Sequence, residues 1–201
     1  MIRQTIISIF DNIWPMLLIF SVIIISIRLC YLNEKKERFI FYKEAFGLLF
    51  CLYIMILFYV VTFQDVSWST SNFIPFKEMF RYSIGSPLFY RNVIGNMLMF
   101  LPYGFFLSKF ISIHKVQRIV FLSFIASTSI EITQLLIGRV FDVDDILLNI
   151  LGGVVGFFLY RFVFFMKENL PNALKKELFY NIIMVIFIIG LGFFVYQFIG
   201  V

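Results

Sequence analysis

The chain has 201 residues, of which 61% are hydrophobic and only 14% are charged. A soluble domain of this size could not bury so much apolar surface, so the composition excludes a soluble globular protein and indicates that lipid is the solvent. The net charge of +5 fits basic loops facing anionic lipid, and we do not expect nucleic acid as a partner.

The apolar runs are continuous and each is close to the roughly 20 residues that a helix needs to cross a bilayer. They predict an all-α integral membrane protein, a polytopic bundle of about six helices that forms a single domain over residues 1–201. The predicted spans are residues 13–32, 45–62, 93–110, 116–137, 146–166 and 179–198.

Basic residues predict the orientation. They are concentrated in the connections 33–44, 109–118 and 167–176, which the positive-inside rule assigns to the cytoplasm. Both termini and the connections 64–92 and 138–145 are then expected outside. The connection 64–92 is the longest, and its aromatic residues, Trp68 among them, fit either a functional loop or a segment lying at the membrane interface.

Glu131 is the least expected residue, because it lies inside the fourth predicted span. An unpaired charge there costs at least ~2.5 kcal/mol. Ser127 and Gln134 share its helix face, since they are four residues before and three residues after it. We therefore expect this polar face to point into the bundle.

The fifth predicted span carries a stripe of acidic, amide and glycine residues spaced three or four apart. The glycines are expected to let a neighbouring helix approach closely, and Asp142 or Asp144 is expected to cap the helix. The third span begins with Arg91, and Asn92 and Asn96 follow on one helix face. The stripe on the fifth span consists of Asp142, Asp145, Asn149, Gly152 and Gly156.

Four polar segments in this order resemble the VanZ family. They are NFIPF (72–76), NVIGNMLMFLPYG (92–104), SIEITQ (129–134) and DVDDILLNILGG (142–153), and the resemblance extends to Gly156. It implies a VanZ-like transmembrane domain with its motifs in residues 72–156, in the plasma membrane of a bacterium. The founding member of the family is associated with low-level resistance to teicoplanin, a lipoglycopeptide that acts outside the cell on lipid-linked wall precursors. The resemblance supplies no biochemical activity.

Two functions stay open, with a binding function ranked first. In it, an outward-facing polar cavity binds or remodels amphiphilic envelope molecules, and the residues expected to contact the ligand are Arg91, Asn92, Asn96, Gln134, Asp142 and Asn149. The alternative is an intramembrane hydrolase or transferase acting on a lipid-linked envelope substrate. Glu131 and Asp145 would then act as an acid and base pair, and Arg139 or Arg91 would hold an anionic headgroup.

A third possibility is purely structural: the polar residues only hold the helices together through hydrogen bonds. We assign no metal ligands, because the chain offers no spaced set of His or Cys, although carboxylates such as Glu131 and Asp142 suit hard cations. The sequence names no cofactor and no oligomeric state.

Overall fold

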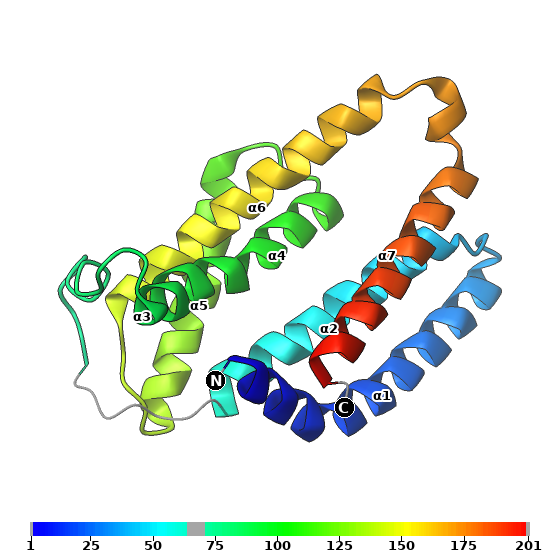
Figure 1. Ribbon diagram of the computed structural model, residues 1–201. Coiled ribbons are helices and arrows are strands. Elements are labelled where there is room, and N and C mark those ends of the chain that lie inside the picture. The colour runs from blue at the N-terminus through cyan, green and yellow to red at the C-terminus, as the bar shows by residue number, and fades with distance from the viewer. Residues whose placement is uncertain (1, 64–70, 200–201) are drawn as a thin grey trace. The chain divides into compact units, whose positions relative to one another are not determined.

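The computed structural model describes residues 2–63 and 71–199, so Trp68 and the first part of the long connection lie outside the described residues. Within the described part of the chain, six helices are long and apolar enough to cross a membrane, which confirms the predicted all-α polytopic fold. By its contacts the chain divides into two compact units. Their positions relative to one another are not determined (Figure 1).

The first unit comprises residues 1–60 and 170–201. It contains α1 (Ile2–Lys35), most of α2 (Phe41–Phe63), the short 3-10 helix η2 (Asn172–Lys175) and α7 (Glu177–Ile199). The Arg28 guanidinium pairs with the Glu44 carboxylate over 2.7 Å, and the Asn181 side chain accepts a hydrogen bond from the backbone N–H of Tyr42. Most side chains of these helices are exposed, as expected for surfaces that face lipid.

The second unit, residues 61–169, holds the predicted polar motifs. It contains α3 (Pro87–Phe89), the π-helix η1 (Tyr90–Ile94), α4 (Gly95–Phe110), α5 (Val116–Leu136) and α6 (Val143–Asn169). Helix α6 packs against both α4 and α5 and is the most buried of the six membrane helices. Its central position explains why its sequence carries the small and polar stripe.

The third membrane helix begins at Pro87, six residues before the predicted start of the span. The Ser86 side chain accepts a hydrogen bond from the backbone N–H of Phe89 over 3.1 Å, and a proline is well suited to the first helical position. The helix then passes through the π-helical turn η1 and continues as α4. Arg91 and Asn92 therefore lie in a π-helical turn, a feature that is frequent at functional sites.

Backbone contact between α4 and α6 depends on glycine. A Cβ atom added to Gly152 or Gly156 would overlap the carbonyl oxygen of Met97 or Leu101 on α4, and one added to Gly104 would overlap that of Gly153. The expectation that the glycines admit a neighbouring helix is confirmed. Near the middle of α6, Phe157 packs with Ile113 and Ile119 in an apolar core.

Candidate functional site

The polar residues of the second unit gather where α4 and α6 begin and α5 ends. Asn72 forms an isolated parallel bridge with Asp142. Its backbone N–H donates to the Phe141 carbonyl over 2.8 Å, and its carbonyl accepts from the Val143 N–H over 3.0 Å. The segment that precedes the third membrane helix is thus bound to the start of α6.

Asp142 caps α6, which is one of the two predicted alternatives, Asp142 or Asp144. Its Oδ1 accepts hydrogen bonds from the backbone N–H of Asp144 over 2.9 Å and from the Asn72 side-chain amide over 2.9 Å. Its own backbone N–H donates to Oε2 of Glu131 over 2.8 Å. The Glu131 side chain is only 2% exposed, so it faces the bundle as expected and joins α5 to the start of α6.

Asp144 holds the outer segment in place. Its carboxylate accepts hydrogen bonds from three backbone N–H groups, those of Phe76, Glu78 and Met79. Phe76 has a φ of 69°, which is uncommon for a residue other than glycine. Successive N–H groups turned toward one anion form a nest, and here the anion is the protein's own buried carboxylate.

Two further side-chain pairs connect the helices. The Asn96 amide on α4 donates to Oδ1 of Asp145 on α6. One turn further along α6, the Asn149 amide donates to the Ser127 hydroxyl on α5 over 2.8 Å. Oδ1 of Asn149 has no hydrogen-bond partner among the described residues. Asn96, Glu131 and Asn149, which lie on three different helices, therefore each bind a residue of another segment and not one another.

Arg139 and Gln134 donate hydrogen bonds to the same backbone carbonyl, that of Val61. The Arg139 guanidinium donates to the carbonyl oxygen of Val61 over 2.6 Å, and the Gln134 amide donates to the same oxygen over 3.1 Å. Val61 lies in the last turn of α2, where carbonyl groups lack partners within the helix. Both side chains thus cap a helix end.

Arg91 and Asn92 differ from the other predicted site residues. No side-chain hydrogen bond or ion pair joins either of them to another residue in 2–63 or 71–199. Arg91 is exposed and Asn92 is half-buried. Of the predicted ligand contacts, Arg91 is the one whose charge is free to meet a molecule at the surface.

The cluster is rich in acidic side chains. Glu131, Asp142 and Asp144 all lie close enough to Asp145 to repel its carboxylate, and Arg139 lies close enough to Glu131 to attract it. Burial raises the pKa of Asp142 above its ordinary value, and the charges of Asp144 and Glu78 act in the same direction. Hydrogen bonds from the Asn72 amide and from the Asp144 backbone N–H oppose this rise.

Within residues 2–63 and 71–199, no group of three or more His, Cys, Asp or Glu side chains has an arrangement that could hold a metal ion. The carboxylates and amides of the cluster serve as hydrogen-bonding groups.

Sequence reasoning missed the roles of Asn72 and Asp144. Both are almost fully buried, at 4% and 1% exposure, although one precedes a membrane helix and the other lies in the first turn of one. The available signal was the run of three acidic residues within Asp142 to Asp145, more than a helix cap requires. Partners about 70 positions away, such as Asn72 for Asp142, leave no periodic trace in the sequence.

The surface above this cluster is apolar and basic. Phe73, Phe76 and Phe80 are 67%, 54% and 79% exposed, and Lys77, Arg81 and Arg91 lie in the same stretch of chain. Arg81 pairs with Glu78 over 3.0 Å. Exposed aromatic and basic side chains of this kind are typical of a segment at the membrane interface.

The fold and this cluster define a class: a polytopic membrane protein in which buried carboxylates and amides link three helices to a segment with exposed aromatic residues. The family model described as VanZ/LLP1 matches residues 46–165. That is more than half of the chain, and the chain belongs to this family. No curated protein and no solved structure matches the chain.

Proposed function

We propose that the protein binds amphiphilic molecules of the bacterial cell envelope at the polar end of its second unit, in the plasma membrane. In this proposal the residues around 73–91 face the outer leaflet, and both termini lie on the same outer side. The apolar part of the ligand contacts the exposed phenylalanines, and Arg91 meets an anionic headgroup. The consequence for the cell is lower susceptibility to lipoglycopeptide antibiotics such as teicoplanin.

One observation carries the proposal: Asp144 fixes an exposed aromatic and basic segment above a buried acid and amide cluster. Aromatic side chains are suited to acyl chains and to the membrane interface. Because three backbone N–H groups are bound to one buried carboxylate, the segment is held in a preformed shape. A preformed surface reduces the entropy that a ligand must overcome on binding.

The buried cluster supplies the polar half of the proposed cavity. In this proposal Asn96, Gln134 and Asp142 reach the ligand only by sharing or leaving the hydrogen bonds described above. The unpartnered oxygen of Asn149 can accept a further hydrogen bond. Arg139 would bind an anion only by leaving the Val61 carbonyl. Arg91 is therefore the preferred headgroup contact and Arg139 the secondary one.

The close approach of Glu131 and Asp145 favours a second candidate function, acid-base catalysis on a lipid-linked envelope substrate. Glu131 is buried and Asp145 is partly buried, and two carboxyl groups placed close enough to repel each other are an arrangement that acid-base catalysis can use. The reaction would be a hydrolysis or a group transfer. Arg139 would then hold the anionic part of the substrate.

Teicoplanin susceptibility of cells lacking the endogenous gene tests the binding proposal and separates it from catalysis. The cells express, at matched membrane levels, wild type, Glu131→Gln, Asp145→Asn or Arg91→Gln. Glu34→Gln is the control, because Glu34 is an exposed acid that lies far from these residues in the sequence. Glutamine keeps an oxygen that accepts from the Asp142 N–H, so a binding protein tolerates Glu131→Gln whereas acid-base chemistry does not.

We expect Arg91→Gln to reduce protection and Glu131→Gln to retain it. Loss of protection in Glu131→Gln with normal membrane levels supports the catalytic alternative. No protection by wild type contradicts the antibiotic role. Cysteine labelling at Ser83 and Ser112, which are both exposed, tests the orientation, and labelling of Ser112→Cys from outside would overturn it.

A further inference from the structure

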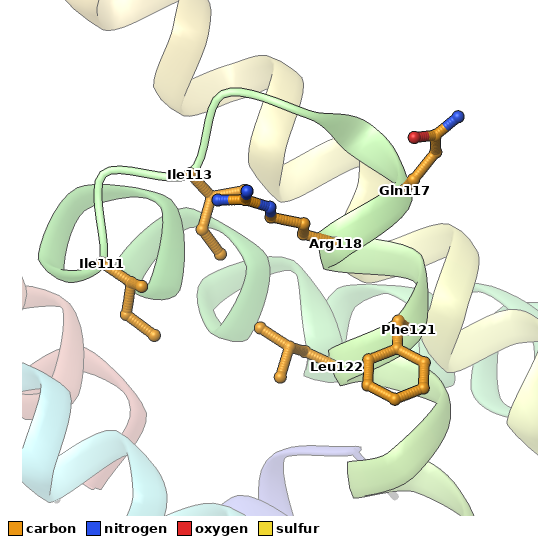
Figure 2. A pocket seen from close by; sticks show the side chains of 6 residues that line it. All are labelled: Ile111, Ile113, Gln117, Arg118, Phe121 and Leu122. Atoms are coloured by element: carbon orange, nitrogen blue, oxygen red, sulfur yellow. The ribbon is translucent and has the colours of Figure 1, made fainter.

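A shallow hollow lies at the end of the second unit that is opposite the polar cluster. Ile111 and Ile113 of the turn after α4 line it together with four side chains near the start of α5 (Figure 2). Arg118 reaches back toward Ile113, whereas Gln117 points away from the other side chains. The α5 residues that line the hollow are Gln117, Arg118, Phe121 and Leu122.

The floor of this hollow is part of the folded core. Ile113 is only 2% exposed and packs with Ile119 and Phe157, and Leu122 packs against the same cluster. Its rim is apolar and open, because Ile111 and Phe121 are 59% and 62% exposed. A preformed apolar surface therefore lies next to an exposed guanidinium.

Charge identifies the chemistry of the occupant. The sequence has no Asp or Glu between Glu78 and Glu131, while Lys109, Lys115 and Arg118 all fall in the stretch that surrounds the hollow. The Arg118 side chain has no hydrogen-bond or ion-pair partner within the described ranges. An anion is the complementary group, and arginine binds phosphate through paired N–H donors.

The depth of the lining side chains in the membrane indicates the apolar part of the occupant. Helix α4 ends at Phe110 and α5 begins at Val116, so the turn between them lies at one surface of the membrane. Phe121 and Leu122 follow Arg118 by three and four residues, which places them roughly 5 Å further along the helix toward the membrane interior. The order is guanidinium at the surface and apolar side chains below it, which matches the phosphate and acyl chains of a lipid.

We propose that this hollow is a binding site for an anionic glycerophospholipid, whose phosphate pairs with Arg118 while an acyl chain covers Ile111, Phe121 and Leu122. The site is separate from the polar cluster and does not depend on the function proposed above. It also does not depend on which side of the membrane the turn faces.

Native mass spectrometry of the full-length protein in detergent, with phosphatidylglycerol and phosphatidylcholine of matched chains, tests the proposal. We expect phosphatidylglycerol to be retained about fivefold more tightly, which is roughly 1 kcal/mol for one basic residue. Arg118→Gln should abolish this preference, and Arg118→Lys should restore part of it. Arg161→Gln is the matched control, because it removes an exposed arginine from α6 that does not line the hollow.

Equal retention of the two lipids by wild type would overturn the proposal. So would an equal effect of Arg118→Gln and Arg161→Gln, because the preference would then reflect net charge alone. Displacement of phosphatidylglycerol by inorganic phosphate at the same concentration would identify a soluble anion, and not a lipid, as the occupant. Ile111→Glu adds a negative charge at an exposed rim position, and full retention of phosphatidylglycerol by that variant would also contradict the site.

Discussion

Asn72 holds Asp142 through its side chain and the residues on both sides of Asp142 through its backbone. Its amide Nδ2 donates to Oδ1 of Asp142 over 2.9 Å, and its N–H and C=O bind Phe141 and Val143. Oδ1 of Asn72 also accepts from the N–H of Ile74 over 3.2 Å. This pair fixes the path of the chain into the segment that Asp144 then binds, so the acidic run at the start of α6 is a structural anchor as well as a candidate site.

Asp144→Ala should release the segment that begins at Phe76. The substitution removes a carboxylate that accepts three backbone hydrogen bonds in a buried place, and we expect a loss of roughly 3 kcal/mol in unfolding free energy. Hydrogen exchange should show faster exchange of the amides of residues 76, 78 and 79. Glu34→Ala, at an exposed acid, serves as the control, and unchanged protection of those three amides in Asp144→Ala would contradict the anchor.

Gly152→Ala and Gly156→Ala should separate α4 from α6. Each added Cβ would overlap a backbone carbonyl of α4, which cannot move like a flexible side chain, so we expect about 2–3 kcal/mol of destabilisation for each. Gly190→Ala is the matched control, since nothing lies within 4 Å of its added Cβ. Thermal unfolding in detergent measures the difference, and equal midpoints for Gly152→Ala and Gly190→Ala would refute the close approach.

Asp142 should make stability depend on pH in a defined direction. Because burial raises its folded-state pKa, the protonated form is favoured by folding. Its contribution to stability is fully present below the unfolded pKa of about 3.9 and is lost as the pH rises through the folded pKa. Asp142→Asn cannot titrate at this position.

The unfolding midpoint of wild type relative to Asp142→Asn should therefore fall as the pH is raised from about 3.5 toward neutrality. The two proteins are compared by thermal unfolding in the same detergent at each pH. A constant difference across this range, or a difference that grows in favour of wild type, would contradict the assigned direction.

Substitutions of Arg139 and Arg91 should have different effects on stability and on ligand binding. Arg139→Gln removes a charged donor to the Val61 carbonyl, so we expect a loss of about 1.5 kcal/mol in unfolding free energy. Arg91→Gln should change stability by less than about 0.5 kcal/mol, because the exposed side chain has no partner in the described ranges. Thermal unfolding and antibiotic susceptibility are measured on both variants. Normal protection by Arg91→Gln would contradict the role of Arg91 as the preferred headgroup contact.

Helical periodicity and composition, which are local properties, account for what the sequence could predict. Apolar runs of bilayer length predicted the six membrane helices. The spacing of Ser127 and Glu131 predicted a buried polar face on α5, and both are buried. The glycines of α6 predicted a close helix contact because a small-residue stripe has few other uses within a membrane helix.

The choice of partners was decided by the tertiary structure. The sequence predicted ligand-binding roles for Arg139 and Gln134 but not the contact that both make with the Val61 carbonyl at the end of α2. It offered Asp144 only as an alternative cap, yet that carboxylate organises a segment more than 60 residues earlier in the chain. A residue's spacing determines which face of its own helix it occupies, whereas its hydrogen-bond partner depends on which distant backbone the fold brings to that face.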